Sequence, residues 1–144
     1  NGNFRIDSGA TYNSIGNQIT NGTYALTLTG NLSSAEFIPS FEASTSATLA
    51  INTYVVSQNA SLTTFTLPTT FLKGSRFRVA GDNAGGWKIA QNAGQVINLG
   101  PVSSTTGVTG YISSSDIGDS VELVATVANT TLRVVNSFGN INYI

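Results

Sequence analysis

The chain has 144 residues, a net charge of −1, charged residues at only 9% of positions, and neither cysteine nor histidine. The missing residue types exclude disulfides, thiol catalysis, imidazole-based metal sites and every catalytic triad that uses imidazole. The small charge gives the molecule no general attraction to nucleic acid, and no apolar run is long enough for membrane insertion. This length predicts one domain. A chain without cysteine that is rich in Ser, Thr, Asn and Gly favours an extracellular, cell-surface or virion-surface location.

Near the start of the chain, residues 5–12 (RIDSGATY) match the aspartic-protease pattern of an apolar residue followed by Asp, Ser or Thr, Gly and Ala. In such proteases two aspartates share one proton and activate water. Asp7 would be the catalyst and Ser8 its supporting hydroxyl, while residues 97–100 (INLG) match the later partner element only loosely. Short motifs recur by chance. We therefore favour a turn at this point and predict no enzymatic activity and no cofactor.

From there on, alternating apolar and polar residues separated by turn formers predict strands and no helix. In chain order the predicted strands cover residues 23–30, 47–57, 62–68, 75–81, 87–91, 95–100 and 120–137, the last containing a turn at ANTT, residues 128–131. The segment 31–46 carries Pro39 and is predicted to be an edge or a connection. These spacings predict an all-β domain, an antiparallel sandwich or prism of short strands.

Residues 81–95 (GDNAGGWKIAQNAGQ) concentrate glycine and asparagine around the single tryptophan and one lysine. A phosphate-binding loop needs Lys and then Ser or Thr directly after the second glycine, but Trp87 intervenes and Ile89 follows Lys88. A hairpin is the better interpretation, with residues 81–85 as its loop and Gly85 and Gly86 supplying positive φ. Its simplest register pairs Arg78 with Lys88 and places Trp87 on the core face with Phe77, Val79 and Ile89.

This hairpin would gather basic residues on its other face. Four of the six positive charges lie between residues 73 and 88, namely Lys73, Arg76, Arg78 and Lys88. Like charges opposite one another destabilise a strand pair, so this basic cluster predicts an anionic partner or neighbouring carboxylates. A solvated strand face is the alternative, and the sequence leaves both open.

Two further acids, Asp116 and Asp119 in SSSDIGDS, lack the additional oxygen ligands of a calcium loop at fixed offsets. A glycosidase pair needs a known separation between its carboxyl groups. We interpret these aspartates as turn formers before the last pair of strands, and we predict no metal site.

The ordered phrases GWKIAQNAGQ (86–95), GDSVEL (118–123), ANTT (128–131) and a closing GN (139–140) resemble a C-terminal module of bacteriophage fibre proteins and of bacterial surface adhesins, some of them collagen-like. The resemblance covers residues 50–144 and leaves residues 1–49, N-terminal strands, outside it. It implies a compact β-head, often trimeric, at the end of a stalk, and it brings no catalytic residues.

Together these features predict a homo-oligomeric attachment module, preferably a trimer, that binds surface polysaccharide, with sulfated or other anionic glycans as candidates. The predicted glycan-binding residues are Lys73, Arg76, Arg78 and Lys88. Two alternatives remain: a structural subunit of an extracellular filament assembled by strand exchange, and the aspartic protease built on Asp7.

Overall fold

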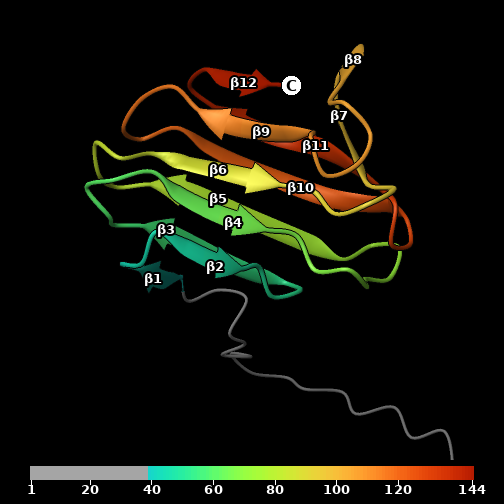
Figure 1. Ribbon diagram of the computed structural model, residues 1–144, viewed down its shortest axis with the longest axis horizontal. Helices are drawn as coiled ribbons and strands as arrows, with labels where there is room; N and C mark the ends of the chain where they lie inside the picture. Colours follow the sequence, from blue (N-terminus) through green and yellow to red (C-terminus); the bar gives the residue numbers. More distant parts are fainter. Residues whose placement is uncertain (1–38) are drawn as a thin grey trace, which may run out of the picture. The chain divides into compact units, whose positions relative to one another are not determined.

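The computed structural model describes residues 39–144, which form twelve β-strands and no helix (Figure 1). This confirms the all-β prediction. Seven strands make sheet A, in the order β1 (Ser40–Glu42), β3 (Thr53–Ser57), β5 (Arg76–Gly81), β10 (Ser120–Val127), β11 (Thr131–Phe138), β7 (Val96–Leu99) and β8 (Val102–Ser103). Five strands make sheet B, in the order β12 (Ile141–Tyr143), β9 (Tyr111–Ser114), β6 (Trp87–Ala90), β4 (Thr63–Thr66) and β2 (Ser46–Thr48).

The prediction of purely antiparallel sheets was wrong, because both sheets are mixed. From β1 to β6 the chain alternates between sheet A and sheet B, so each new strand runs parallel to the strand before it in the same sheet. Strands β7 and β11 are also parallel. The remaining pairs are antiparallel: β10 with β5 and β11, β9 with β6 and β12, and β7 with β8.

The alternating strands form successive coils, each made of one strand in sheet A and the next in sheet B. The second and third coils pair residues 24 positions apart in both sheets, Thr53 with Phe77 and Thr63 with Trp87. Their crossing turns match in sequence, SQNAS at 57–61 and GDNAG at 81–85. In each turn the asparagine amide donates to a carbonyl of the preceding coil, Asn59 to Ala43 and Asn83 to Gln58. This 24-residue repeat was present in the sequence and was not recognised there.

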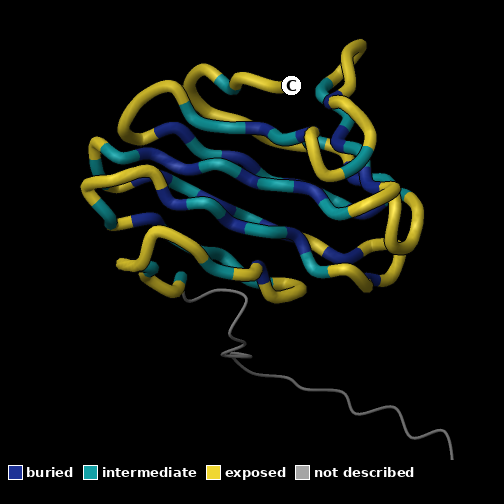
Figure 2. Tube along the Cα trace, in the orientation of Figure 1, coloured by how far each residue is buried: buried dark blue, intermediate teal, exposed yellow. Residues whose placement is uncertain are grey.

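The core lies between the two sheets and contains Phe77, Val79, Trp87 and Ile89, all fully buried as the sequence predicts. Figure 2 shows buried and half-buried positions alternating along the central strands. These four side chains meet across the interface between the sheets, and not side by side on one hairpin. The Trp87 indole N–H donates to the backbone oxygen of Asp119 at 2.8 Å, which joins the third coil to the loop before β10.

Local turn signals predicted some strands well and others poorly. Residues 120–137 form the antiparallel pair β10 and β11 with a turn between Val127 and Thr131, as predicted. The single predicted strand 47–57 is wrong, since the chain turns at Asn52, whose φ is 60°, and divides into β2 and β3 in different sheets. The β10–β11 pair lies between β5 and β7, so it ends the parallel stacking of coils in sheet A.

Candidate functional site

The predicted hairpin of residues 75–91 does not form. Strand β5 pairs with β3 and β10 in sheet A, and β6 pairs with β4 and β9 in sheet B. The intervening loop carries the chain from one sheet to the other. Gly86 has the expected positive φ of 63°, whereas Gly85 is needed for close packing, because a Cβ there would lie 2.3 Å from the Ser61 carbonyl oxygen. The pairing of Arg78 with Lys88 was therefore wrong.

The basic cluster is consequently divided between two faces. Arg76 and Arg78 alternate with buried Phe77 and Val79, so they point outward from sheet A. Lys88 points outward from sheet B, and its Nζ lies 4.1 Å from the centre of the Tyr111 ring. Lys73 is exposed in the loop that precedes β5. Only the two arginines remain neighbours on one strand.

A carboxylate that the sequence did not connect with these arginines lies between them. Glu122 of β10 stands opposite Arg78 in the antiparallel register. One of its oxygens, Oε1, is 2.7 Å from Arg76 Nη1 and 3.3 Å from Arg78 Nε. The Glu122 side chain is only 18% exposed, so it lies along the sheet surface. For Arg76 and Arg78, Glu122 thus supplies a neighbouring carboxylate, one of the two outcomes predicted for the basic cluster, and it offsets repulsion between these two arginines.

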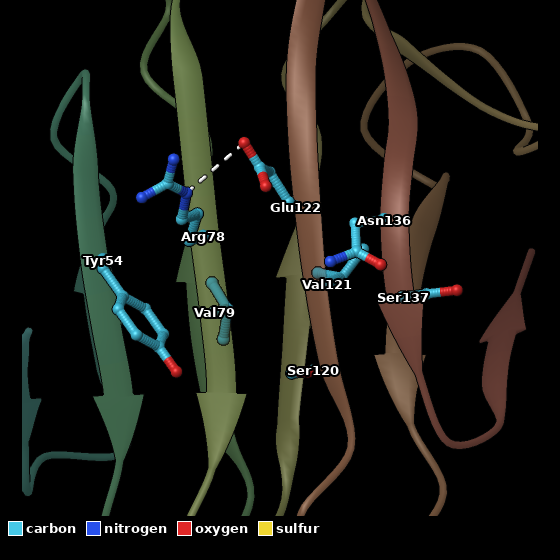
Figure 3. Close-up of a pocket in the computed structure, with 8 residues that line it drawn as sticks. All are labelled: Tyr54, Arg78, Val79, Ser120, Val121, Glu122, Asn136 and Ser137. Atoms are coloured by element: carbon cyan, nitrogen blue, oxygen red, sulfur yellow. Dashed lines mark ion pairs between the residues drawn. The ribbon is translucent and has the colours of Figure 1, made fainter. Parts of the chain in front are cut away.

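A row of polar side chains crosses the outer face of sheet A at this level. The registers of β3, β5, β10 and β11 align four residues, here called the polar row: Tyr54, Arg78, Glu122 and Asn136. They line a hollow of about 200 Å³ together with Ser120, Ser137 and the buried residues Val79 and Val121. In Figure 3 the Tyr54 ring borders one side of this hollow and the Asn136 amide the other, with Arg78 and Glu122 between them.

The hollow is small and has a mixed lining. Enclosed small-molecule pockets usually measure about 300–1,000 Å³, so this one would accept a single ring or one segment of a polymer. Its floor is the sheet itself, since Val79 and Val121 are buried. The rim combines an aromatic ring, a planar amide, a guanidinium and a carboxylate, which together offer an apolar surface and both hydrogen-bond donors and acceptors.

One more arginine belongs to the outer face of sheet A. Val124 stands opposite Arg76 on one side and opposite Arg133 of β11 on the other. The two arginine backbones are therefore two strand spacings apart, about 10 Å. Arg133 was missed because its position depends on the pairing of β5 with β10, which no local sequence signal indicated.

The other candidates from the sequence lie elsewhere. Asp7 and Ser8 lie outside the described residues, so the protease hypothesis stays a prediction. In residues 97–100, Ile97 is fully buried in β7. The Asp119 carboxylate accepts the backbone N–H groups of Ser115 and Asp116 at 2.7 and 2.9 Å, which confirms the turn interpretation.

Within residues 39–144, no three acidic side chains gather where a metal ion could be held. The same part of the chain contains no helix with the length and apolar character needed to cross a membrane.

Comparison with models of known protein families found no match, and a search of curated proteins found no similar sequence. The resemblance to fibre-head modules therefore stays a prediction.

Proposed function

We propose that this protein is a non-enzymatic, oligomeric attachment module that binds surface polysaccharide on the outer face of sheet A. The observation that supports the proposal best is the polar row above its hollow. Sugars present flat apolar ring faces and hydroxyl edges, and the Tyr54 ring beside Arg78, Glu122 and Asn136 offers partners for both. The resemblance of residues 50–144 to fibre heads supports an extracellular or virion surface as the location and a trimer as the assembly.

The charge of this face favours chains with spaced carboxylates over densely sulfated chains. Glu122 already contacts Arg76 and Arg78, so a dense row of sulfates would meet a carboxylate at the centre of the site. An isolated uronate could instead approach one arginine and leave the Glu122 contacts largely in place. Arginine forks bind carboxylates bidentately. We therefore propose uronate-containing polysaccharide as the preferred ligand class, which narrows the sulfated and anionic candidates predicted from the sequence.

The test measures binding of the whole chain to immobilised hyaluronan, heparin and dextran, which represent spaced carboxylates, dense sulfates and neutral sugars. Wild type is expected to prefer hyaluronan. Tyr54→Ala and Asn136→Ala should each weaken binding about tenfold, equivalent to about 1.4 kcal/mol, with unchanged melting temperature. Lys88→Ala is the matched control on the other sheet and should bind like wild type. Binding that survives Tyr54→Ala and is lost in Lys88→Ala would contradict the proposal.

The proposed trimer is tested by a separate measurement, the mass of the protein in solution. Individual surface contacts are weak, and linking three sites raises the apparent affinity through avidity. Light scattering at micromolar concentration should give about three times the chain mass of 14.9 kDa. A monomer that persists at high concentration would remove avidity from the mechanism and would contradict the fibre-head hypothesis.

A second candidate function, the filament subunit, is favoured by one feature of sheet A. Among the described residues, β11 pairs with β7 only over Thr131–Arg133, the first part of β11. The rest of β11 borders an open hollow of about 450 Å³ lined by Leu99, Gly100 and residues 134–137. An unpaired strand edge of this kind can accept a strand from another chain. Mass growing without limit as concentration rises would favour this function over a closed trimer.

A further inference from the structure

A second row crosses sheet A next to the polar row. The registers of β1, β3, β5, β10 and β11 align five residues, here called the phenylalanine row: Phe41, Val56, Ala80, Ser120 and Phe138. On β3, β5, β10 and β11 this row lies two residues away from the polar row, about 7 Å along the strand and on the same outer face. The two end members, Phe41 and Phe138, are 61% and 74% exposed.

The phenylalanine row is low in the middle and high at its ends. Ala80 and Ser120 have small side chains and Val56 one of intermediate size, while the large rings stand at the two ends of the row, on β1 and β11. Four strand spacings separate the two rings, about 19 Å at the backbone. Ser120 also lines the hollow beneath the polar row, so the two rows share one continuous surface.

A single exposed phenylalanine is ordinary on a protein surface. Two of them stand at the ends of one register row, which runs beside a row of hydrogen-bonding groups. This part of the outer face therefore has an apolar side and a polar side. A chain of sugar rings has the same division, because its rings present apolar faces and its hydroxyls project from the edges. Sugar rings stacked on Phe41 and Phe138 would hold such a chain across the strands, and the hydroxyls of the chain would contact the polar row.

We propose that the ligand is an extended polysaccharide that crosses the strands of sheet A from Phe41 to Phe138, so that the protein binds within a chain and not at its terminus. This inference rests on the proposed function and specifies the length and direction of the ligand. The distance of about 19 Å from Phe41 to Phe138 spans several sugar rings, whereas the hollow at the polar row takes only one. Affinity must therefore depend on ligand length, and that dependence must come from the two phenylalanines.

The test uses size-defined oligosaccharides of hyaluronan from disaccharide to octasaccharide, with dextran oligosaccharides as the neutral counterpart. Wild-type affinity is expected to rise at least about tenfold from disaccharide to hexasaccharide and then to level off. Phe41→Ala and Phe138→Ala should each weaken octasaccharide binding about fivefold to tenfold and leave disaccharide binding unchanged. Blocking both ends of the octasaccharide should have no effect, because neither terminus is recognised. Leu72→Ala, which alters a side chain that is 77% exposed in the loop before β5, is the matched control.

The outcomes separate this inference from the proposed function. If Tyr54→Ala abolishes binding while affinity is independent of length and of both phenylalanines, the site is correct and the extended ligand is wrong. If wild type binds no oligosaccharide or polysaccharide of either series, the proposed function fails as well. If Phe41→Ala or Phe138→Ala lowers the mass in solution, the row is an interface between copies of the chain, and the inference is overturned.

Discussion

The outer faces of sheet A and sheet B differ in chemistry although both sheets cover the same core. Sheet A presents the polar row and the phenylalanine row. Sheet B presents a row of mostly small hydroxyl and amide side chains, Asn142, Ser113, Lys88, Thr64 and Ser46, aligned by the registers of its five strands. Its lysine lies against the Tyr111 ring. The core sets which residues point inward on both sheets, but it places no such demand on the outer faces. The difference between the two outer faces therefore does not follow from the packing of the core.

The largest loss of stability is expected in the loop that carries the chain from β5 in sheet A to β6 in sheet B. Gly85→Val would place side-chain atoms against the carbonyl oxygens of Ser61 and Asn59, which a Cβ at Gly85 would meet at 2.3 and 2.5 Å. We expect a loss of at least about 3 kcal/mol in the free energy of unfolding, at the upper end for overpacking. Urea denaturation monitored by circular dichroism measures it. Ala84→Val, the exposed neighbour in the same loop, should cost less than about 0.5 kcal/mol.

A smaller loss is expected where the third coil meets the loop before β10. Trp87→Phe removes the indole hydrogen bond to Asp119 and leaves part of a fully buried site unfilled. We expect about 2 kcal/mol of destabilisation, measured by the urea midpoint. Tyr111→Phe, on the outer face of sheet B, is the control and should leave that midpoint nearly unchanged. Equal effects from both variants would mean that Trp87 does not join these two parts.

The smallest change in stability, with an informative change in binding, is expected at Glu122. Glu122→Gln removes the charge shared by Arg76 and Arg78 and should cost less than about 1 kcal/mol, as is usual for ion pairs on a protein surface. It should also shift preference toward heparin, so that elution from a heparin column needs more salt. Glu42→Gln on β1 makes the same change of net charge away from these arginines. If both variants elute alike, only net charge matters and the site on sheet A is not specific.

Local signals in the sequence were sufficient for some parts of this fold and insufficient for others. The β10–β11 pair was predictable because its strands are joined by a short turn, and the inward positions of Phe77, Val79, Trp87 and Ile89 followed from their alternation. The parallel partners were not predictable in this way, since Thr53 and Phe77 lie 24 residues apart with a strand of the other sheet between them. Only the repeated asparagines of the two crossing turns indicated that stacking.

The candidate site depended on which strands lie side by side, in one parallel pair, β3–β5, and two antiparallel pairs, β5–β10 and β10–β11. Two members of the basic cluster, Arg76 and Arg78, were correctly placed together because they share a strand. Lys88 was placed wrongly, since a short glycine-rich loop favours a hairpin in a sequence and here joins two sheets. Tyr54, Glu122 and Asn136 could not be associated with Arg78 before the order of β3, β5, β10 and β11 was known.

The most direct test of binding on sheet A is a titration of the isotope-labelled protein with hyaluronan octasaccharide, followed in amide ¹H–¹⁵N spectra. We expect the largest shifts at Tyr54, Ala80, Ser120 and Asn136, on the polar and phenylalanine rows, and none at Lys88, Thr64 or Ser113 on sheet B. Shifts that centre on Lys88 and its neighbours, with the residues of sheet A unaffected, would contradict the assignment of binding to the outer face of sheet A.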